Sequence, residues 1–590
     1  MRSFLVFALV GSLVWLVGCG GGTPVGVTPI TVSLTPSSAQ TINQGATLGI
    51  VATVANDPTG SGVSWNLSGV GSLNTQTETT SSVTYDAPSS VTSNTTVTVT
   101  ATSIADTSAT ASLQITVQAS SVTVSLTPSK PQIVSQGGTV SITASVKGDT
   151  TGVNWSISPA SGDGTLKSET ATTVTYDAPA SVTSNAVVTI TATSKKNTSS
   201  TAQLVINLVA PGQSNVQPIA VDGGPLTNYP DGAFTSVTIC VPGTSQCQTI
   251  EGILVDTGSV GLRILASEIN LPLQPLAAAS GGTLNNCVSF VDGSFLWGEV
   301  EPADVYMAGE VSSELPVHVL ADPTTFTIPT TCSMGGTDED NQTALGANGI
   351  IGVGMEPTDC TIQGQNFCNV PSNQNIYYGC TSSGCEITTV PIADQVTNPV
   401  DLFAANSVTS GEDNNGVILQ FPSLSGAAAT LDGSMIFGIG TESNNALGGA
   451  TVYTVDPSDD DFTTENFEGQ TMPSSFIDSG SNGFFFPSTF IVCPDNADFY
   501  CDAQNASATN VGANNAQGIV DFTIANADDL FKTGDFAYGD LGGPNGTYPC
   551  SGPTCSFDWG LPFFFGRSVY TSIDGQTVPS GQPAAPWWAY

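Results

Sequence analysis

Two short segments of the chain each place an aspartate directly after an apolar run. Residues 252–259 read GILVDTGS and residues 475–481 read SFIDSGS, which puts Asp256 and Asp478 222 positions apart. An apolar strand carries such an aspartate into a buried position, and the following glycine lets the chain turn sharply. The hydroxyl residues beside each aspartate can hydrogen-bond the carboxylate or the facing loop. The two segments together therefore predict a paired-carboxylate site.

Two carboxyl groups held about 3 Å apart cannot both ionise, so they share a proton. The charged member can act as a general base on a water, and the protonated member can hydrogen-bond a carbonyl and later supply a proton. This chemistry hydrolyses peptide bonds without histidine or metal. It suits a chain with one histidine, His318, which any Ser-His-Asp or Cys-His triad would have to use. A single histidine also excludes a His-rich zinc site.

The chain has few charged residues, and they are unevenly distributed along it. The formal net charge is −40, and residues 210–590 contain 41 acidic but three basic residues, whereas residues 1–209 contain eight and six. This shift marks a domain boundary. It excludes a nucleic-acid partner, because no basic face can be built. It also favours a protein that works in acid.

The first part of the chain contains one unit twice. VSLTPS begins at positions 32 and 124, the tryptophan of GVSWNL at 65 recurs in GVNWSI at 155, and VTYDAP begins at 83 and 174. The repeat of about 91 residues, with alternating apolar positions, predicts immunoglobulin-like sandwiches at 28–118 and 121–209, each with about seven strands and one central tryptophan. They resemble bacterial Ig-like repeats. A stalk is favoured over adhesion, and residues 210–216 read as a linker to a domain at 217–590.

The N-terminus has the pattern of an export signal. An arginine and an apolar run precede LVGC, which resembles the bacterial lipoprotein box and predicts a signal peptide at 1–18, lipidation of Cys19 and a tether at 19–27. The alternative is an ordinary cleaved signal with a chance cysteine. Because position 20 is not aspartate, we expect a lipid-anchored protein of the bacterial cell envelope, in the outer membrane.

The remaining twelve cysteines all lie in the acidic domain, where an exported protein would form disulfides. Close spacing favours five pairs and leaves a sixth, although twelve cysteines allow thousands of pairings. The favoured pairs are 240–247, 360–368, 380–385, 493–501, 550–555 and 287–332.

Beyond the two aspartate loops, the acidic domain resembles a pepsin-type aspartic peptidase. The similar segments occur in the family's order over about 225–575: the hairpin at 234–239, FVDGS at 290–294, DVYMAG at 304–309, GIIGVG at 349–354, DLF at 401–403, GSMIFG at 433–438, GLPF at 560–563 and RSVYT at 567–571. The chain also resembles a bacterial branch of uncharacterised lipoproteins that share DTGSVGLR and GLPFFFGR. The resemblance implies a bilobal, pepsin-like double β-barrel, so the fold class expected for the whole chain is all-β.

The resemblance also implies roles for individual residues. Asp256 and Asp478 would be the catalytic pair, and Phe290 and Gly293 would belong to a flap, with Phe290 at its tip. Residues that brace the two loops or hydrogen-bond the carboxylates would be Thr257, Gly258, Ser259, Ser479, Gly480 and Ser481. No metal or cofactor is expected.

Several positions depart from the family pattern. Phe290 stands where the family has tyrosine, Arg263 where it has tryptophan and Leu561 where it has an acid, and residues 355–400 form an enlarged insertion. The sequence therefore leaves two functions open. The first is an acid-active aspartic endopeptidase that cleaves a polypeptide or other extracytoplasmic polymer. The second is a surface-binding or adhesion lipoprotein with a degenerate peptidase fold.

Other residues have mainly structural interpretations. We expect His318 on a strand, Arg263 in a buried ion pair rather than beside the cleft, and 459–461 in a solvated loop. The two phenylalanine triplets at 484–486 and 563–565 are expected in core strands.

Overall fold

The computed structural model describes residues 28–590 with short gaps. The gaps are 90, 92–93, 120–121, 160–161, 184, 211–213, 245, 321–325, 363, 371–374, 404–411, 425 and 457–459. The predicted signal peptide, tether and Cys19 lie outside the described residues. Within the described part, no helix is long and apolar enough to cross a membrane. The chain divides into two compact units, Met1–Val122 and Thr123–Tyr590, and each is described by itself.

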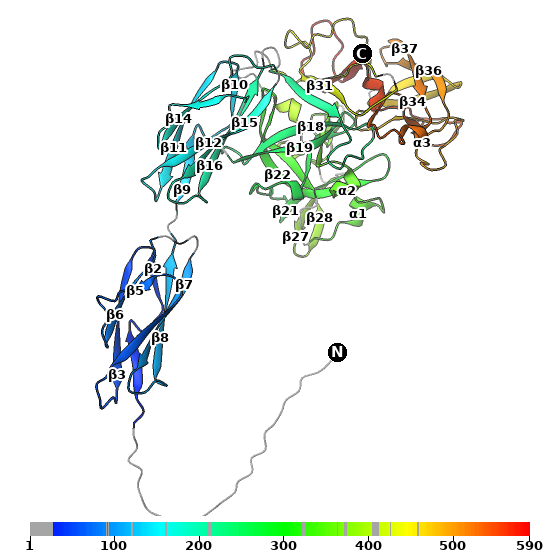
Figure 1. The fold of residues 1–590 in the computed structure, drawn as a ribbon. Helices are drawn as coiled ribbons and strands as arrows, with labels where there is room; N and C mark the ends of the chain where they lie inside the picture. The colour runs from blue at the N-terminus through cyan, green and yellow to red at the C-terminus, as the bar shows by residue number, and fades with distance from the viewer. Residues whose placement is uncertain are drawn as a thin grey trace, which may run out of the picture. The chain divides into compact units, whose positions relative to one another are not determined.

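Each sequence repeat folds into a sandwich of two four-stranded sheets (Figure 1). The first contains β1 Thr31–Thr35, β2 Gln40–Asn43, β3 Thr47–Ala55, β4 Val63–Ser68, β5 Ser72–Leu73, β6 Ser82–Asp86, β7 Thr95–Ser103 and β8 Thr110–Gln118. The second contains β9 Thr123–Thr127, β10 Gln132–Ser135, β11 Thr139–Lys147, β12 Val153–Ser158, β13 Thr165–Lys167, β14 Thr173–Asp177, β15 Ala186–Ser194 and β16 Thr201–Val209.

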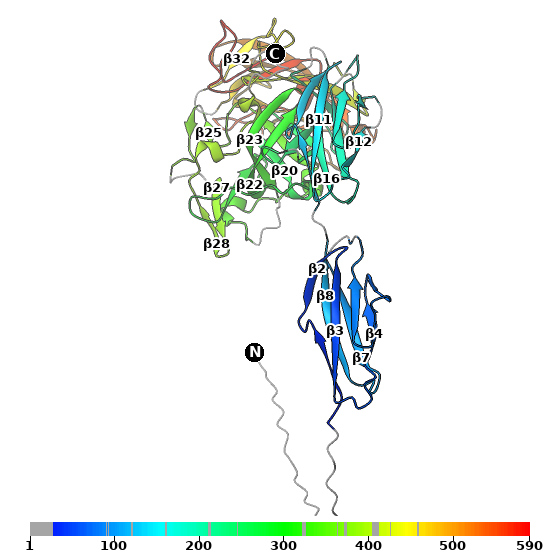
Figure 2. The ribbon, with the colours of Figure 1, turned by 90° about the vertical axis from the view of Figure 1, so that its left-hand side faces the viewer.

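The two sandwiches have the same strand order, which confirms a duplicated immunoglobulin-like module. The first has sheets β1-β3-β6-β5 and β2-β8-β7-β4, and the second has β9-β11-β14-β13 and β10-β16-β15-β12. Figure 2 shows strands of both sandwiches from a second side. Each has eight strands in its described residues, against the predicted number of about seven. Trp65 and Trp155 are partly buried, pack against the core of their sandwich and donate Nε1–H to the carbonyls of Thr79 and Thr170. The fully buried aromatic residues are the tyrosines of VTYDAP, 85 and 176.

The third part of the chain is built on a 15-stranded sheet and a seven-stranded sheet. The larger sheet contains β17 Val216–Val221, β18 Ala233–Cys240, β19 Cys247–Asp256, β20 Val260–Leu265, β21 Thr283–Ser289, β22 Phe295–Met307, β23 Glu310–Leu320, β24 Gly349–Val353, β27 Tyr377–Thr381, β28 Gly384–Ile387, β29 Gly416–Gln420, β31 Leu431–Phe437, β32 Val452–Thr454, β41 Ser568–Ser572 and β42 Trp587–Ala589. The smaller contains β33 Phe462–Phe467, β34 Gln470–Ile477, β35 Phe484–Phe486, β36 Gln504–Val511, β37 Gln517–Ile524, β39 Gly542–Pro544 and β40 Asp558–Trp559.

Minor elements connect these strands. They are the pairs β25 Thr361–Ile362 with β26 Gln365–Asn366 and β30 Ala427–Ala428 with β38 Ala537–Tyr538, and the short helices α1 Thr330–Ser333, α2 Gln342–Leu345, α3 Ala527–Leu530, η1 Ala266–Glu268, η2 Ile392–Asp394, η3 Pro399–Leu402 and η4 Leu561–Phe564.

One arrangement of four strands occurs in both sheets. In the larger sheet, β19 lies parallel to β24, β24 antiparallel to β20, and β20 parallel to β23. In the smaller sheet, β34 lies parallel to β40, β40 antiparallel to β35, and β35 parallel to β39. In addition, β22 pairs with β18, so that β18, β19, β24, β20, β23 and β22 form a closed ring. Asp256 ends β19 and Asp478 directly follows β34, so the duplicated arrangement delivers one aspartate from each half.

The disulfide prediction is confirmed for all six pairs. The bonds join Cys240 to Cys247, Cys287 to Cys332, Cys360 to Cys368, Cys380 to Cys385, Cys493 to Cys501 and Cys550 to Cys555.

The phenylalanine triplets differ from each other. Phe484 and Phe486 are buried in β35, as expected. The second triplet was wrongly predicted as a strand, since Phe563 and Phe564 belong to the 3-10 helix η4. Pro562, near the start of η4, has no N–H to donate to a sheet ladder and has a fixed φ that suits a helix start.

Candidate functional site

The two aspartate loops contact each other through reciprocal hydrogen bonds. The backbone N–H of Thr257 donates to Oγ of Ser479 (3.1 Å), and the backbone N–H of Ser479 donates to Oγ1 of Thr257 (2.9 Å). The Ser479 hydroxyl donates to the carbonyl of Val255 (2.8 Å), and the Thr257 hydroxyl to that of Ile477 (3.4 Å). Each hydroxyl residue therefore both donates to and accepts from the facing loop.

Each carboxylate is also held by its own loop. The N–H of Gly258 donates to Oδ1 of Asp256 (2.8 Å) and the Ser259 hydroxyl to its Oδ2. In the second loop, the N–H of residue 480 donates to Oδ1 of Asp478 (2.7 Å) and the hydroxyl of residue 481 to its Oδ2 (3.0 Å). All eight positions of the two predicted tetrapeptides thus meet at one place.

The space between the loops requires glycine. A Cβ on Gly258 would lie 2.5 Å from Cγ of Asp478, and a Cβ on Gly480 would lie 2.8 Å from Cγ of Asp256. The two aspartate side chains are close enough for the charge of one to act on the protonation of the other. The pKa of Asp478 is raised well above its usual range, first by burial and then by the charge of Asp256.

A third carboxyl group, which the sequence analysis missed, lies beside this pair. Asp558 is buried in β40, and its Oδ2 lies within hydrogen-bond distance of the Ser481 hydroxyl oxygen (2.6 Å). Burial raises the pKa of Asp558 to about 8. An acidic residue in an otherwise apolar strand of the FDWGLPF segment was the available signal.

The predicted flap residues lie in a tight hairpin between β21 and β22. The N–H of Phe290 donates to the carbonyl of Ser294 (2.9 Å), and the N–H of Gly293, whose φ is +88°, donates to the carbonyl of Phe290 (3.0 Å). The Phe290 side chain packs on an apolar cluster that includes Leu254, two residues before Asp256. The Cys287–Cys332 disulfide joins this hairpin to α1.

Tyr229 supplies an aromatic hydroxyl that the sequence analysis also missed. Its ring packs edge-on against Phe234 (5.6 Å between centroids) and lies in the same cluster as Phe290. The pKa of Tyr229 is raised, first by burial and then by the charges of Asp256, Glu339 and other acids, including Asp478. A tyrosine hydroxyl therefore stands in the field of the carboxyl pair although the flap tip has none.

Arg263 belongs to a buried polar network, as expected for a structural ion pair. Its Nη2 lies 3.8 Å from a carboxylate oxygen of Asp359, and its Nη1 donates to Asn286 (2.9 Å). Nη1 also lies 2.7 Å from Nδ1 of His318, which is on strand β23, as predicted. Burial, followed by the positive charge of Arg263, holds the pKa of His318 well below its usual range, so this histidine is a neutral acceptor in the network.

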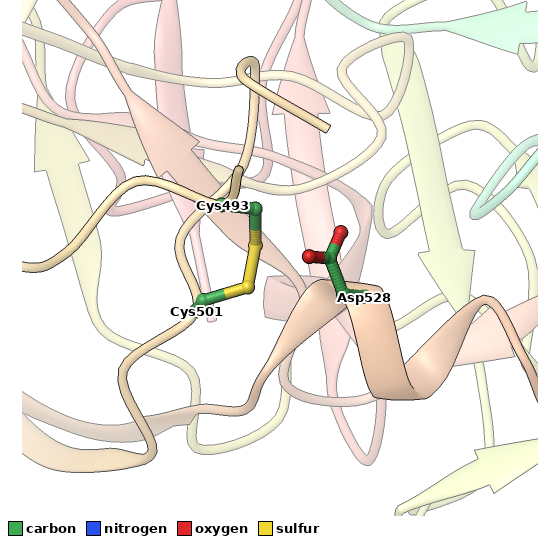
Figure 3. A group of neighbouring side chains, drawn as sticks. All are labelled: Cys493, Cys501 and Asp528. Carbon is green, nitrogen blue, oxygen red and sulfur yellow. A yellow bond between two sulfur atoms is a disulfide. The ribbon is translucent and has the colours of Figure 1, made fainter. Parts of the chain in front are cut away.

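One group of side chains has the composition of a metal site but not its chemistry. Cys493, Cys501 and Asp528 lie together (Figure 3), with their candidate ligand atoms within 4.8 Å of one another. The two sulfur atoms are joined in a disulfide, so neither is a thiolate ligand. Asp528 accepts a hydrogen bond from Asn496 (2.6 Å), which gives its carboxylate a structural partner.

Comparison with known proteins assigns the family of the third part. Residues 211–590 match the family described as "Protein of unknown function (DUF3443)", and the chain belongs to that family. A search of curated proteins found no match.

Solved structures with similarity to the chain include two multidomain proteins. The titin domains Z1Z2 in complex with telethonin are 18% identical, with 30% of this chain and 95% of that chain covered and a TM-score of 0.20. The Yersinia pseudotuberculosis adhesin InvE is 14% identical, with 46% and 89% covered and a TM-score of 0.17. Scores this low carry no argument, so the immunoglobulin-like assignment rests on the strand orders above.

Proposed function

We propose that the third part of the chain is an acid-active aspartic endopeptidase with a pepsin-like, bilobal double-barrel fold. One observation carries the proposal: the 256–259 and 478–481 loops hydrogen-bond each other reciprocally and bring the buried Asp256 and the partly buried Asp478 together. The duplicated four-strand arrangement and the closed ring of strands that includes β19, which ends at Asp256, support the fold.

The proposed reaction uses a water and no covalent intermediate. Asp478, whose pKa is raised, holds the shared proton, and Asp256 acts as the general base on a water between them. The water attacks the peptide carbonyl while Asp478 donates its proton to the carbonyl oxygen. Asp256, which has taken a proton from the water, gives it to the leaving nitrogen as the C–N bond breaks, and a hydroxyl of the tetrahedral intermediate returns a proton to Asp478. We further propose that the Tyr229 hydroxyl, whose pKa is raised in part by the charges of both aspartates, hydrogen-bonds the substrate.

The proposed setting is the bacterial cell envelope. Lipidation of Cys19 would anchor the chain. Because the residue after Cys19 is not aspartate, the proposed location is the outer membrane, and the two immunoglobulin-like modules would serve as a stalk. The proposed substrates are polypeptides outside the cytoplasm.

The test is cleavage of a quenched peptide library and of an unfolded protein by the chain from residue 19 onward, between pH 3 and pH 8. We expect cleavage at about pH 3–5 and little at pH 7, because the pair works only while singly ionised. Asp256→Asn and Asp478→Asn should each abolish cleavage and keep the fold. Asp432→Asn, which changes an exposed acid on β31, is the matched control. Cleavage that survives either pair variant would refute the proposed mechanism.

A second candidate function, ligand binding without cleavage, is favoured by a separate cavity. This cavity of about 620 Å³ lies against the seven-stranded sheet and is lined in part by Phe522, Pro562, Phe565 and Arg567. Its volume is in the range of small-molecule sites. A well-folded chain that cleaves nothing at any pH would favour this function.

A further inference from the structure

The Ser481 hydroxyl lies between two carboxyl groups and has a single proton. Its Oγ is 2.6 Å from Oδ2 of Asp558 and 3.0 Å from Oδ2 of Asp478. A hydroxyl donates one hydrogen bond, so it can satisfy one of these oxygens and must accept from the other. One of the two carboxyl groups therefore donates a proton to Ser481.

The surroundings of Asp558 identify it as the donor. It is 4% exposed, and its Oδ1 has no hydrogen-bond partner among the residues that the structure describes. An ionised Asp558 would leave that oxygen charged, buried and unpaired, which is costly. A protonated Asp558 places its O–H on Ser481 and leaves only a carbonyl oxygen without a partner. The raised pKa of Asp558, about 8, agrees with this state in acid.

The same position in the other half of the duplicated fold is apolar. Leu254 and Phe476 each lie two residues before the aspartate of their loop. Leu254 pairs with Ile350 of β24, and Phe476 pairs with Asp558 of β40, so Ile350 is the counterpart of Asp558. Within the described residues, Ser259 has Asp256 as its carboxylate partner and no second acid. The third carboxyl group is thus confined to the side of Asp478.

We propose that Asp558 is a positioning residue: it stays protonated and donates to Ser481, which thereby directs its own hydroxyl to Asp478. The chain Asp558→Ser481→Asp478 fixes the orientation of one catalytic carboxyl group and stabilises the singly ionised pair. This inference rests on the proposed function for its kinetic consequences. The state of Asp558 itself does not depend on it.

The kinetic test compares two variants of the chain from residue 19 onward. In Asp558→Asn, the amide N–H still donates to Ser481, so kcat/KM and both limbs of the pH profile should stay within about twofold and 0.2 pH units of wild type. In Asp558→Leu, the donor is lost, so the singly ionised pair is less stable and the acidic limb should move up by about one pH unit, a tenfold change in proton affinity. KM should change little.

Two kinetic outcomes would overturn the inference. If Asp558 is ionised in the working range, both variants remove its charge and both pH profiles move to lower pH. If Asp558 only fills space, neither variant moves a limb.

A second measurement reads the state of Asp558 without activity. In the chain labelled with ¹³C at the aspartate carboxyl carbons, the Asp558 resonance, assigned by its absence from Asp558→Asn, should titrate near pH 8. An Asp558 resonance that titrates below pH 5 would refute the inference. Wild-type protein that shows the Asp558 resonance near pH 8 but no cleavage would refute the proposed function and leave the protonation state inferred for Asp558 standing.

Discussion

Gly258→Ala tests the closest approach between the two aspartate loops. The alanine Cβ would lie 2.5 Å from Cγ of Asp478, whereas ordinary contacts of a Cβ begin at 3.4 Å. The loops must therefore separate by about 0.9 Å. Gly258 is not among the glycines with positive φ, so the effect of the methyl group is one of space rather than backbone strain.

A separation of this size should affect chemistry more than stability. Misplacement of reacting groups by about 1 Å costs about 10²-fold in rate, so kcat/KM should fall at least that far with KM nearly unchanged. Overpacking of a buried contact destabilises by about 1–3 kcal/mol. The measurements are steady-state cleavage at pH 4 and denaturant unfolding of the same preparations.

The matched control is Gly449→Ala. A Cβ at Gly449 would meet no atom within 4 Å, so activity and stability should stay at wild-type values. If Gly258→Ala retains kcat/KM within twofold and unfolds like wild type, the loops do not meet as described. The reasoning that joins Asp256 and Asp478 into one site would then fail.

Three further predictions address stability, the flap and the anchor. Burial raises the pKa of Glu310 from 4.5 to about 9, so the native state binds a proton that the unfolded chain has lost; this stabilisation is complete below pH 4.5 and falls as pH rises to about 9. Glu310→Gln should flatten the decline in melting temperature between pH 5 and pH 9, and an unchanged slope would contradict the burial argument. The double substitution Cys287→Ala, Cys332→Ala opens a 45-residue loop and should lower the free energy of unfolding by about 3–4 kcal/mol. Denaturant unfolding of wild type and of this variant, with the other disulfides intact in both, measures the difference. Cys19→Ser should release the protein from the membrane fraction, and unchanged membrane association would point to another anchor.

Local patterns account for what the sequence could predict. The disulfide pairs are mostly five to eight residues apart, so chain geometry favours them over distant partners. The repeats are predicted by their own recurrence. The interior of each sandwich was less predictable: the tyrosine side chain of residue 85 hydrogen-bonds the carbonyl of Val70, which allows full burial, whereas Trp65 bonds at the edge. Which large aromatic residue becomes buried depends on such distant acceptors.

The candidate site also contains residues that local sequence patterns predict and a residue that they do not. Asp256 and Asp478 were predictable because an apolar strand, an aspartate and a small turn repeat in order. Asp558 was not, because its partner Ser481 lies 77 residues away and the two meet only through the pairing of β34 with β40. A duplicated sequence motif thus predicts the symmetric part of a site, where each loop does the same thing. The residues that make its halves differ come from strands whose neighbours are set by the fold, so Asp558 has to be found in the structure.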